Sequence, residues 1–268
     1  MAKLRLIIGT SNAHKVREIS EILAPLQGVQ VVPFSDECDE LPEIEEVGST
    51  FSEIAGAKAQ LYARYLFARR GASISGRHTS VSDDTDSIEK TSAERARQRA
   101  RAALTPDPPA YAGSRRVLAD SHRVKPSDIL VLADDSGLVV DALGGAPGIR
   151  SARYAGAHGD DLRNNQKVLR EMEEVADKKR TARFVCAIAL ATQHHVLFTV
   201  EGKVDGTIAR EAQGDQGFGY DPIFYYPPYQ MTFGEAKPEA KNAVSHRANA
   251  LKLLKSRLMR LMQDEGMA

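Results

Sequence analysis

Short apolar runs alternate along the chain with longer segments of helical spacing. The apolar runs are typical of buried strands, and they lie at residues 4–8, 29–32, 129–132, 138–140, 184–191 and 196–208. Apolar residues recur at helical spacing in residues 12–23, 50–67, 160–174 and 242–262. Because strands and helices are interspersed, with both hairpin and crossover connections between strands, the pattern predicts an α/β fold with a mixed sheet.

Residues 69–127 break this pattern. They are rich in Gly, Ser and Pro and contain few large apolar side chains, which predicts a mobile insertion within one domain that spans residues 1–268. Residues 92–104 could form a basic helix, but its arginines alternate and do not share one helical face. A solvated helix is therefore favoured over a nucleic-acid site.

Composition narrows the choice of partners. Lys plus Arg equals Asp plus Glu at 36 each, so no general basic field attracts nucleic acid, and an anionic ligand must be held by local groups. No apolar run is long enough for a membrane span, and the N-terminal residues enter a strand pattern without a signal peptide. The two cysteines, Cys38 and Cys186, have no metal or disulfide spacing. These features predict a cytoplasmic protein that binds neither nucleic acid nor membrane.

The first candidate site is a turn between a strand and a helix. Free backbone N–H groups and the helix dipole favour an anion at such a turn, and a lysine in the first helical turn adds a full positive charge. The alternative is a capped helix with an exposed lysine, with Ser11 or Asn12 as the cap. The residues of this candidate phosphate site are Thr10, Ser11, Asn12, Ala13, His14 and Lys15.

The second candidate site is an acidic pair, Asp134–Asp135, which we expect at the end of a hydrophobic strand and before Ser136. Adjacent strand residues point to opposite faces, so at most one of the two carboxylates should point directly into a given site. Such a carboxylate could bind a divalent metal or activate water, and the alternative is an Asx-type turn. Glu53 is a possible second metal ligand, although Thr50 and Glu53 also fit a capping box.

The third candidate site combines an aromatic loop with a cationic cluster. Gly217 and Gly219 flank Phe218, which could stack on a flat ligand, and Tyr220 and Asp221 follow. Hydrogen-bonding groups come from this loop and from Lys241, His246 and Arg247 further along the chain. This combination of stacking and hydrogen-bonding groups indicates a pocket for a heteroaromatic base.

Taken together, these segments resemble the inosine triphosphate pyrophosphatase family. The resemblance is carried by the motifs ADDSGL, GGAPGIRSARYAG, GFGYDPIF and SHRANAL, together with residues 10–15 and 48–59. It implies a curved mixed sheet in two α/β lobes with the site in a cleft between them, and a homodimer. The implied reaction converts ITP, dITP or XTP to the monophosphate and pyrophosphate with Mg²⁺.

The resemblance also implies roles for single residues. Thr10, Asn12 and Lys15 would bind phosphates, while Glu53 and Asp135 would hold the metal and Asp135 would act as general base. Phe218 would stack on the base, and Gly219, Tyr220 and Asp221 would complete that wall. The base and the phosphates would be contacted by Lys241, His246 and Arg247, and Ser136 would touch the substrate.

The chain departs from the family pattern at three points. Ile54 stands where the family has Asn, Ser11 replaces the commoner Gly, and residues 69–127 are additional. Two alternatives remain at this stage. One is a related pyrophosphatase acting on pyrimidine or methylated nucleotides, and the other is a nucleotide-binding regulator without catalysis.

Overall fold

The computed structural model describes residues 4–10, 12–38, 41–44, 46–75, 124 and 128–264, with the backbone alone for residues 14 and 71–75. Its centre is a seven-stranded sheet in the order β2-β1-β3-β4-β5-β6-β7. β1 pairs in parallel with β2 and β3, and the other neighbours are antiparallel, which confirms the predicted mixed sheet. The strands are β1 Leu4–Ile8, β2 Val29–Pro33, β3 Leu130–Val140, β4 Thr181–Ala191, β5 Val196–Ile208, β6 Phe224–Tyr226 and β7 Met231–Thr232.

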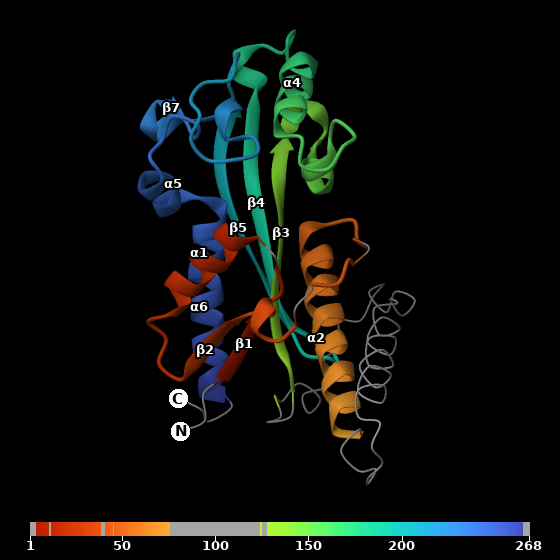
Figure 1. Ribbon diagram of the computed structural model, residues 1–268. Coiled ribbons are helices and arrows are strands. Elements are labelled where there is room, and N and C mark those ends of the chain that lie inside the picture. The colour runs from red at the N-terminus through yellow and green to blue at the C-terminus, as the bar shows by residue number, and fades with distance from the viewer. Residues whose placement is uncertain are drawn as a thin grey trace.

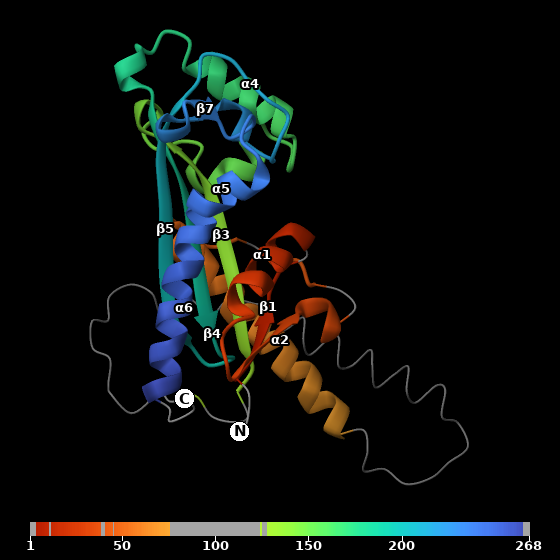
Figure 2. The same cartoon turned by 90° about the vertical axis from the view of Figure 1, so that its left-hand side faces the viewer.

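The helices divide the molecule into two lobes that share the long strands β3, β4 and β5 (Figure 1). The lower lobe carries β1 and β2 with α1 and α6 on one side of the sheet and α2 on the other. The upper lobe carries α4, β6 and β7, with α5 beside it. Figure 2 shows the curvature of the sheet and the position of α6 along it. The helices are α1 Ala13–Leu23, α2 Phe51–Ser75, α4 Asp161–Glu171, α5 Pro238–Val244 and α6 His246–Asp264.

Side-chain alternation assigns each position of β3 to one of two sheet faces. Val131 and Ala133 belong to the core under α2, whereas Leu130 and Leu132 belong to the core under α1 and α6. We call these the α2 face and the α6 face. Above them, Leu138 and Val140 belong to a third core in the upper lobe. A strand with both faces covered reads as a continuous hydrophobic run, as residues 129–133 do.

The predicted position of the acidic pair was wrong. Asp134 and Asp135 lie in the middle of β3, because the runs 129–132 and 138–140 form one strand and not two. β4 pairs with this strand without a break from Val131 to Val140. The backbone hydrogen bonds of the ladder are therefore kept. The two carboxylates form ion pairs with Lys15 and Lys58.

The last helix was predicted as one element and is two. α5 ends at Val244, and Ser245 has an extended backbone with ψ of 155°. Its hydroxyl then accepts a hydrogen bond of 3.1 Å from the N–H of Ala248, so Ser245 caps α6. The break turns the chain just before His246 and Arg247.

The boundary of the predicted insertion also needs correction, because α2 continues from Phe51 to Ser75 and so includes residues 69–75. The rest of that segment, with the possible helix at 92–104, falls outside the described residues except for Val124, and its insertion character stays a prediction. Among the residues that the structure describes, no helix is both long and apolar enough to cross a bilayer.

Candidate active site

The candidate site lies where β1 ends and leaves one edge of β3 uncovered. β1 pairs with β3 only as far as Ile8 and Leu132, and the N–H of Gly9 closes this ladder on the carbonyl of Leu132 at 2.7 Å. The next pairing on that edge in the described chain is the isolated bridge between Val139 and Pro147. Ligands of α/β sheets bind in such crevices at strand ends. Asp134 and Asp135 flank this open edge from opposite faces.

The turn after β1 caps α1 as predicted. The side chain of Asn12 accepts from the N–H of Lys15 at 3.3 Å, and the hydroxyl of Thr10 accepts from the N–H of Asn12 at 3.2 Å. α1 begins at Ala13. Ser11 and the side chain of His14 fall outside the described residues. The capping interpretation and the phosphate interpretation use the same atoms, so this geometry is compatible with both.

On the α6 face, Asp134 lies between two cations. Its Oδ2 is 2.8 Å from Lys15 Nζ and 4.0 Å from Arg247 Nε, and its side chain is only 2% exposed. Burial alone would raise the pKa of Asp134, but the charges of Lys15 and Arg247 hold it below its ordinary value. Asp134 therefore stays ionised, and its ion pairs connect α1 and α6 to β3.

On the α2 face, Asp135 shares a single cation with a second carboxylate. Lys58 Nζ lies 3.2 Å from Asp135 Oδ1 and 2.6 Å from Glu46 Oε1, and Arg153 binds the other oxygen of Glu46 at 2.6 Å. Burial and the charge of Glu46 outweigh the attraction of Lys58 and raise the pKa of Asp135 to about 6. Lys58 could have been only a surface charge by sequence, but its side chain is 18% exposed and lies at the site.

Glu53 is held at the start of α2. Its N–H donates to the hydroxyl of Thr50 at 3.1 Å, and its Oε2 accepts from the N–H and hydroxyl of Ser49 at 2.8 and 2.7 Å. The hydrogen bonds from Ser49 lower the pKa of Glu53. The capping interpretation is thus present in the structure, with Ser49 as the partner of the carboxylate, and Glu53 is ionised and available to a cation.

Asp135 and Glu53 offer carboxylate oxygens, which are the ligand type that hard divalent cations prefer. The described residues contain no group of three or more His, Cys, Asp and Glu side chains arranged around one point. Mg²⁺ is commonly bound through one or two carboxylates, with water and substrate phosphates as the other ligands. Asp135 already attracts the cationic Lys58 through Oδ1, which shows that this position favours positive charge.

In the upper lobe, the aromatic loop presents Phe218 next to two cations. Phe218 is 48% exposed, and Lys241 Nζ and Arg247 Cζ lie 4.5 and 5.8 Å from its ring centroid. The carboxylate of Asp221 accepts from the N–H of Phe218 at 2.8 Å and pairs with Lys241. Gly217 has φ of 79°, and a Cβ there would lie 2.1 Å from Asp221 Oδ2, so the loop requires glycine at this position.

His246 and Arg247 begin α6 beneath this loop and are buried. The ring of His246 stacks on Phe184 at 4.9 Å, and burial with the charge of Arg247 lowers its pKa well below the ordinary value, so the imidazole is neutral. Arg247 donates to Glu18 Oε2 at 2.9 Å. Within the described part of the chain, His246 Nδ1 and Arg247 Nε have no hydrogen-bond partner.

Tyr220 and Ser136 occupy different positions. The hydroxyl of Tyr220 donates to the carbonyl of Ser151 at 2.7 Å, and the ring belongs to the core of the upper lobe. Tyr220 therefore supports the loop from inside. Ser136 is half-buried and shares the α6 face with Asp134 by strand alternation.

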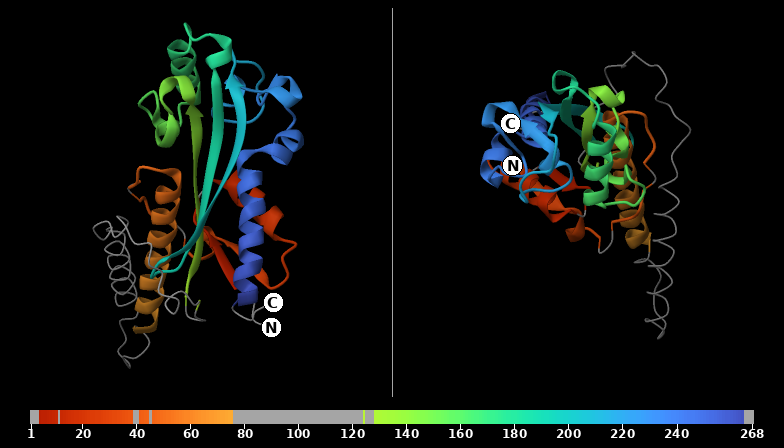
Figure 3. Two further views of the ribbon diagram at one scale, coloured as in Figure 1. Left: turned by 180° about the vertical axis from the view of Figure 1, so that it is seen from behind. Right: turned by 90° about the horizontal axis from the view of Figure 1, so that it is seen from above.

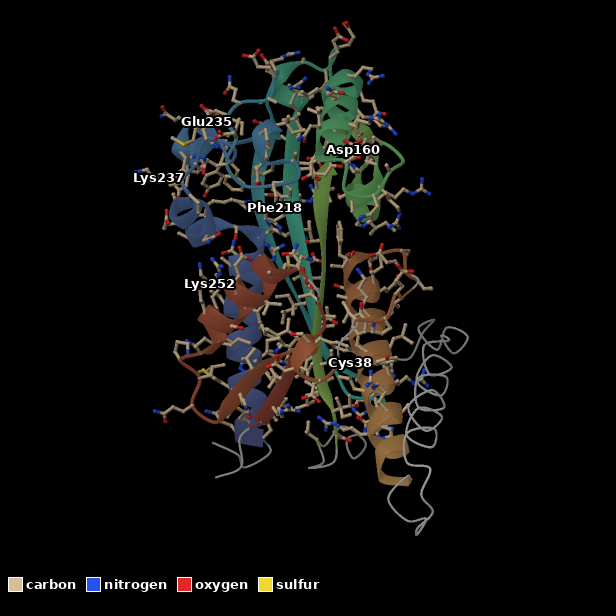
Figure 4. All side chains as sticks on the ribbon, in the orientation of Figure 1. Cys38, Asp160, Phe218, Glu235, Lys237 and Lys252 are labelled. Carbon is tan, nitrogen blue, oxygen red and sulfur yellow. The ribbon has the colours of Figure 1, made fainter. Side chains whose placement is uncertain are left out.

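The structure thus arranges the predicted residues as two groups around the open edge of β3. On the α6 face, Asp134 and Ser136 lie with Lys15, Lys241, His246, Arg247 and the Phe218 loop. Asp135 lies on the α2 face, beside α2, whose first turn contains Glu53. Arg247 links the first group, since it reaches both the Phe218 ring and Asp134. Figure 4 shows Phe218 on the upper lobe near the long strands.

Sequence reasoning missed several residues of this site. Glu46 lies between the predicted elements, Glu18 lies in a helix predicted from its apolar residues alone, and Asp134 was given no role of its own. Of these residues, only Asp134 could have been predicted from the sequence. Side chains alternate along a strand, so Asp134 and Asp135 must contact different partners on opposite faces of the sheet. A hollow of about 650 Å³ lies elsewhere, near Lys203, Tyr226 and Lys252, and contains none of the predicted site residues.

Comparison with known proteins identifies the family of the chain. The model of the Ham1 family matches residues 6–85 and 66–257. Proteins named dITP/XTP pyrophosphatase from Clostridium perfringens and Listeria monocytogenes are 34% and 36% identical to the chain, which is covered to 97% in both cases, with 99% and 97% of the relatives covered. The solved structure of a HAM1 protein from Coxiella burnetii matches with a TM-score of 0.66 and 32% identity over 96% of this chain and 99% of that one. A Staphylococcus aureus Ham1 protein matches with a TM-score of 0.63 and 29% identity over 95% of this chain and 98% of that one.

Proposed function

The chain belongs to the Ham1 family, and from that premise we propose that it hydrolyses ITP, dITP and XTP to the nucleoside monophosphate and pyrophosphate. The observation that carries the proposal is the continuous link from the exposed ring of Phe218 through Arg247 to Asp134 and Lys15. It joins a stacking platform for a base to a cationic helix terminus for phosphates. The names of the relatives support the substrate class.

The base end of the site favours a 6-oxo purine. The unpartnered Nε–H of Arg247 and the neutral ring of His246 lie beneath the Phe218 loop. A 6-oxo group accepts from such donors, whereas the 6-amino group of adenine leaves a buried donor unpaired. Sites built on such bonds reject the mismatched base strongly. Phe218 offers its exposed surface for stacking.

The phosphate end is formed by the turn after β1. A nucleoside triphosphate carries about four negative charges, which must be neutralised before water can approach phosphorus. Lys15 and the N-terminus of α1 supply positive charge there. Lys15 is already held by Asp134, so its ammonium is oriented before a substrate arrives.

Asp135 is the residue we assign as general base. Lys58 occupies its Oδ1, which leaves Oδ2 to take a proton from the water that attacks the α-phosphorus, and that attack releases pyrophosphate. Asp135 and Glu53 would hold a Mg²⁺ ion, which when bound supplies charge neutralisation and polarises the phosphate oxygens. A base whose pKa is about 6 is ionised at neutral pH yet basic enough to accept a proton.

The same proposal includes a homodimer and a cytoplasmic location. The homodimer follows from the family resemblance. Cys186 is a buried free thiol, which is the usual state of a cysteine in a reducing compartment.

Steady-state hydrolysis with Mg²⁺ tests the substrate assignment. Purified protein is assayed with ITP, XTP, GTP, ATP and dTTP, and both pyrophosphate and monophosphate are quantified. We expect ITP and XTP to be cleaved with kcat/KM at least about 100-fold above ATP, since a lost base hydrogen bond leaves buried donors unpaired. Cleavage of GTP or dTTP as fast as ITP would refute the substrate assignment and favour the related pyrophosphatases. Nucleotide binding without cleavage would favour a regulator.

A further inference from the structure

The loop that carries Phe218 is held from behind by helix α4. Both backbone groups of Gly219 are bonded to this helix: its N–H donates to Asp161 Oδ2 at 2.7 Å, and its carbonyl accepts from Asn165 Nδ2 at 2.9 Å. Asp161 and Asn165 are four residues apart on α4 and therefore point to the same side of it. The two peptide groups that flank the Cα atom of Gly219 are thus each fixed by a side chain of the same helix.

Asn165 is a buried asparagine whose side-chain amide bonds the carbonyl of Gly219. The residue is 7% exposed, and its Oδ1 has no hydrogen-bond partner in the described part of the chain. Burying an amide with one group unpaired is unfavourable, and a native structure keeps such a group only for a reason. The bond from Nδ2 to Gly219 is the contact that explains why an asparagine is present here.

Apart from the contacts of its ring with Lys241 and Arg247, Phe218 depends on backbone hydrogen bonds for its position. The residue is 48% exposed, and its neighbours on both sides are glycines in the left-handed region, with φ of 79° at Gly217 and 63° at Gly219. Glycine has more accessible backbone conformations than any other residue, so such a loop is ordered only where its backbone groups are bonded. Asp221 holds the N–H of Phe218, and α4 holds the next peptide.

We propose that Asp161 and Asn165 are positioning residues for the nucleobase: they fix the peptide groups on both sides of Gly219 so that the ring of Phe218 is already placed for stacking when the substrate arrives. This inference rests on the function proposed above and adds two residues that contact the loop and not the substrate. Pre-ordering the loop lowers the entropic cost of binding. The loss of these bonds should therefore weaken substrate binding more than it slows catalysis.

The test compares two adjacent asparagines of α4. Asn165→Ala should raise the KM for ITP about 3- to 10-fold, the usual range for one lost hydrogen bond, with kcat changed less than about twofold. Asn164→Ala is the matched control, because Asn164 is also buried but its Oδ1 accepts from the N–H of Ala155. Asn164→Ala should lower the melting temperature without raising KM.

Two further measurements separate positioning from general destabilisation. In a Phe218→Ala background, Asn165→Ala should add less than twofold to KM, since the residue acts through the ring. Asp161→Asn keeps an oxygen that can accept from Gly219 and should retain wild-type KM, whereas Asp161→Ala should not. Amide hydrogen exchange at Gly219 in the free protein should accelerate in Asp161→Ala.

An active wild-type protein with an unchanged KM in Asn165→Ala and Asp161→Ala would overturn this inference alone. Equal KM effects of Asn164→Ala and Asn165→Ala would do the same, because they would indicate a structural role. A wild-type protein that neither binds nor cleaves ITP would overturn the proposed function and this inference together.

Discussion

Asp134 and Asp135 are neighbours on one strand, yet they have opposite electrostatic environments. Asp134 is nearly inaccessible and faces two cations, which lower its pKa. Asp135 shares one lysine with Glu46, and its pKa is raised to about 6. When the surroundings shift the pKa values of two neighbouring acids in opposite directions, the acid with the raised pKa is suited to proton transfer. The acid with the lowered pKa is suited to holding a negative charge. Under the function proposed above, the pair separates a structural role from a catalytic one within two residues.

The largest effect should come from removing the base. Asp135→Asn should lower kcat for ITP about 100- to 10,000-fold, the range for loss of a general base, because the amide cannot take a proton. Binding of ITP, measured by calorimetry, should change much less. The control is Asp141→Asn, an aspartate just beyond β3 that bonds Thr181 and Arg183. Near-wild-type turnover in Asp135→Asn would remove Asp135 from the base role.

Removing the neighbour should mainly affect stability. Asp134→Ala leaves Lys15 and Arg247 without their buried partner and should lower the free energy of unfolding by about 3–5 kcal/mol. Urea denaturation with EDTA present measures this without metal binding. Asp134→Asn keeps the shape of the side chain and should cost less than Asp134→Ala. A loss no greater than that of Asp141→Ala would show that the Asp134 network contributes little.

The two carboxylates should also give opposite pH dependences of stability. The pKa of folded Asp135 is raised from 3.8 to about 6, so the folded state binds more protons than the unfolded state between these values. Its contribution to stability is complete below about pH 4 and falls by roughly 3 kcal/mol as the pH rises through 6. Asp134, with a lowered pKa, contributes above the ordinary range and loses its contribution as the pH falls.

Metal-free urea titrations from below pH 4 to pH 8 measure this difference. In Asp135→Asn the decline between pH 4 and pH 6 should become shallower, and the low-pH loss assigned to Asp134 should remain. An unchanged slope in the variant would contradict the assignment of this titration to Asp135.

The smallest effect should come from the lysine that Asp135 shares. Lys58→Met removes an attraction that lowers the pKa of Asp135, so the acidic limb of kcat should move to higher pH by about one unit. The pH profile of kcat measures this shift. Lys167→Met is the control, because Lys167 lies on α4 and donates to the backbone carbonyl of Tyr154, away from Asp135. A shift to lower pH would reverse the sign of the interaction.

The sequence predicts much of this molecule because its signals are local. The run before Gly9 predicts β1, and the polar turn with Asn12 predicts the start of α1, since strand hydrophobicity and capping depend on near neighbours. The motifs around Phe218 and Arg247 were specific enough to indicate the family, and the comparisons confirm it. The roles of single site residues stay predictions.

Other features could not be read from the sequence because they depend on distant partners. Two adjacent aspartates predict the end of a strand when only the sequence is considered. They fit inside β3 because Lys15 of α1 and Lys58 of α2 pair with them. Ser245 breaks a continuous apolar stripe that otherwise predicts one helix. The hydrogen bonds from α4 to Gly219 join residues more than fifty positions apart, and the local sequence pattern does not predict them.

The continuity of β4 and β5 limits how this molecule can move. Strands of 11 and 13 residues run from one lobe to the other and pair along almost their whole length (Figure 3). Hinges need a few positions that can absorb large dihedral changes, and a hydrogen-bonded ladder crossing the boundary supplies none. Opening and closing as two hinged halves is therefore disfavoured, and adjustment to a ligand would come from gentle changes of sheet twist and from the peripheral loops.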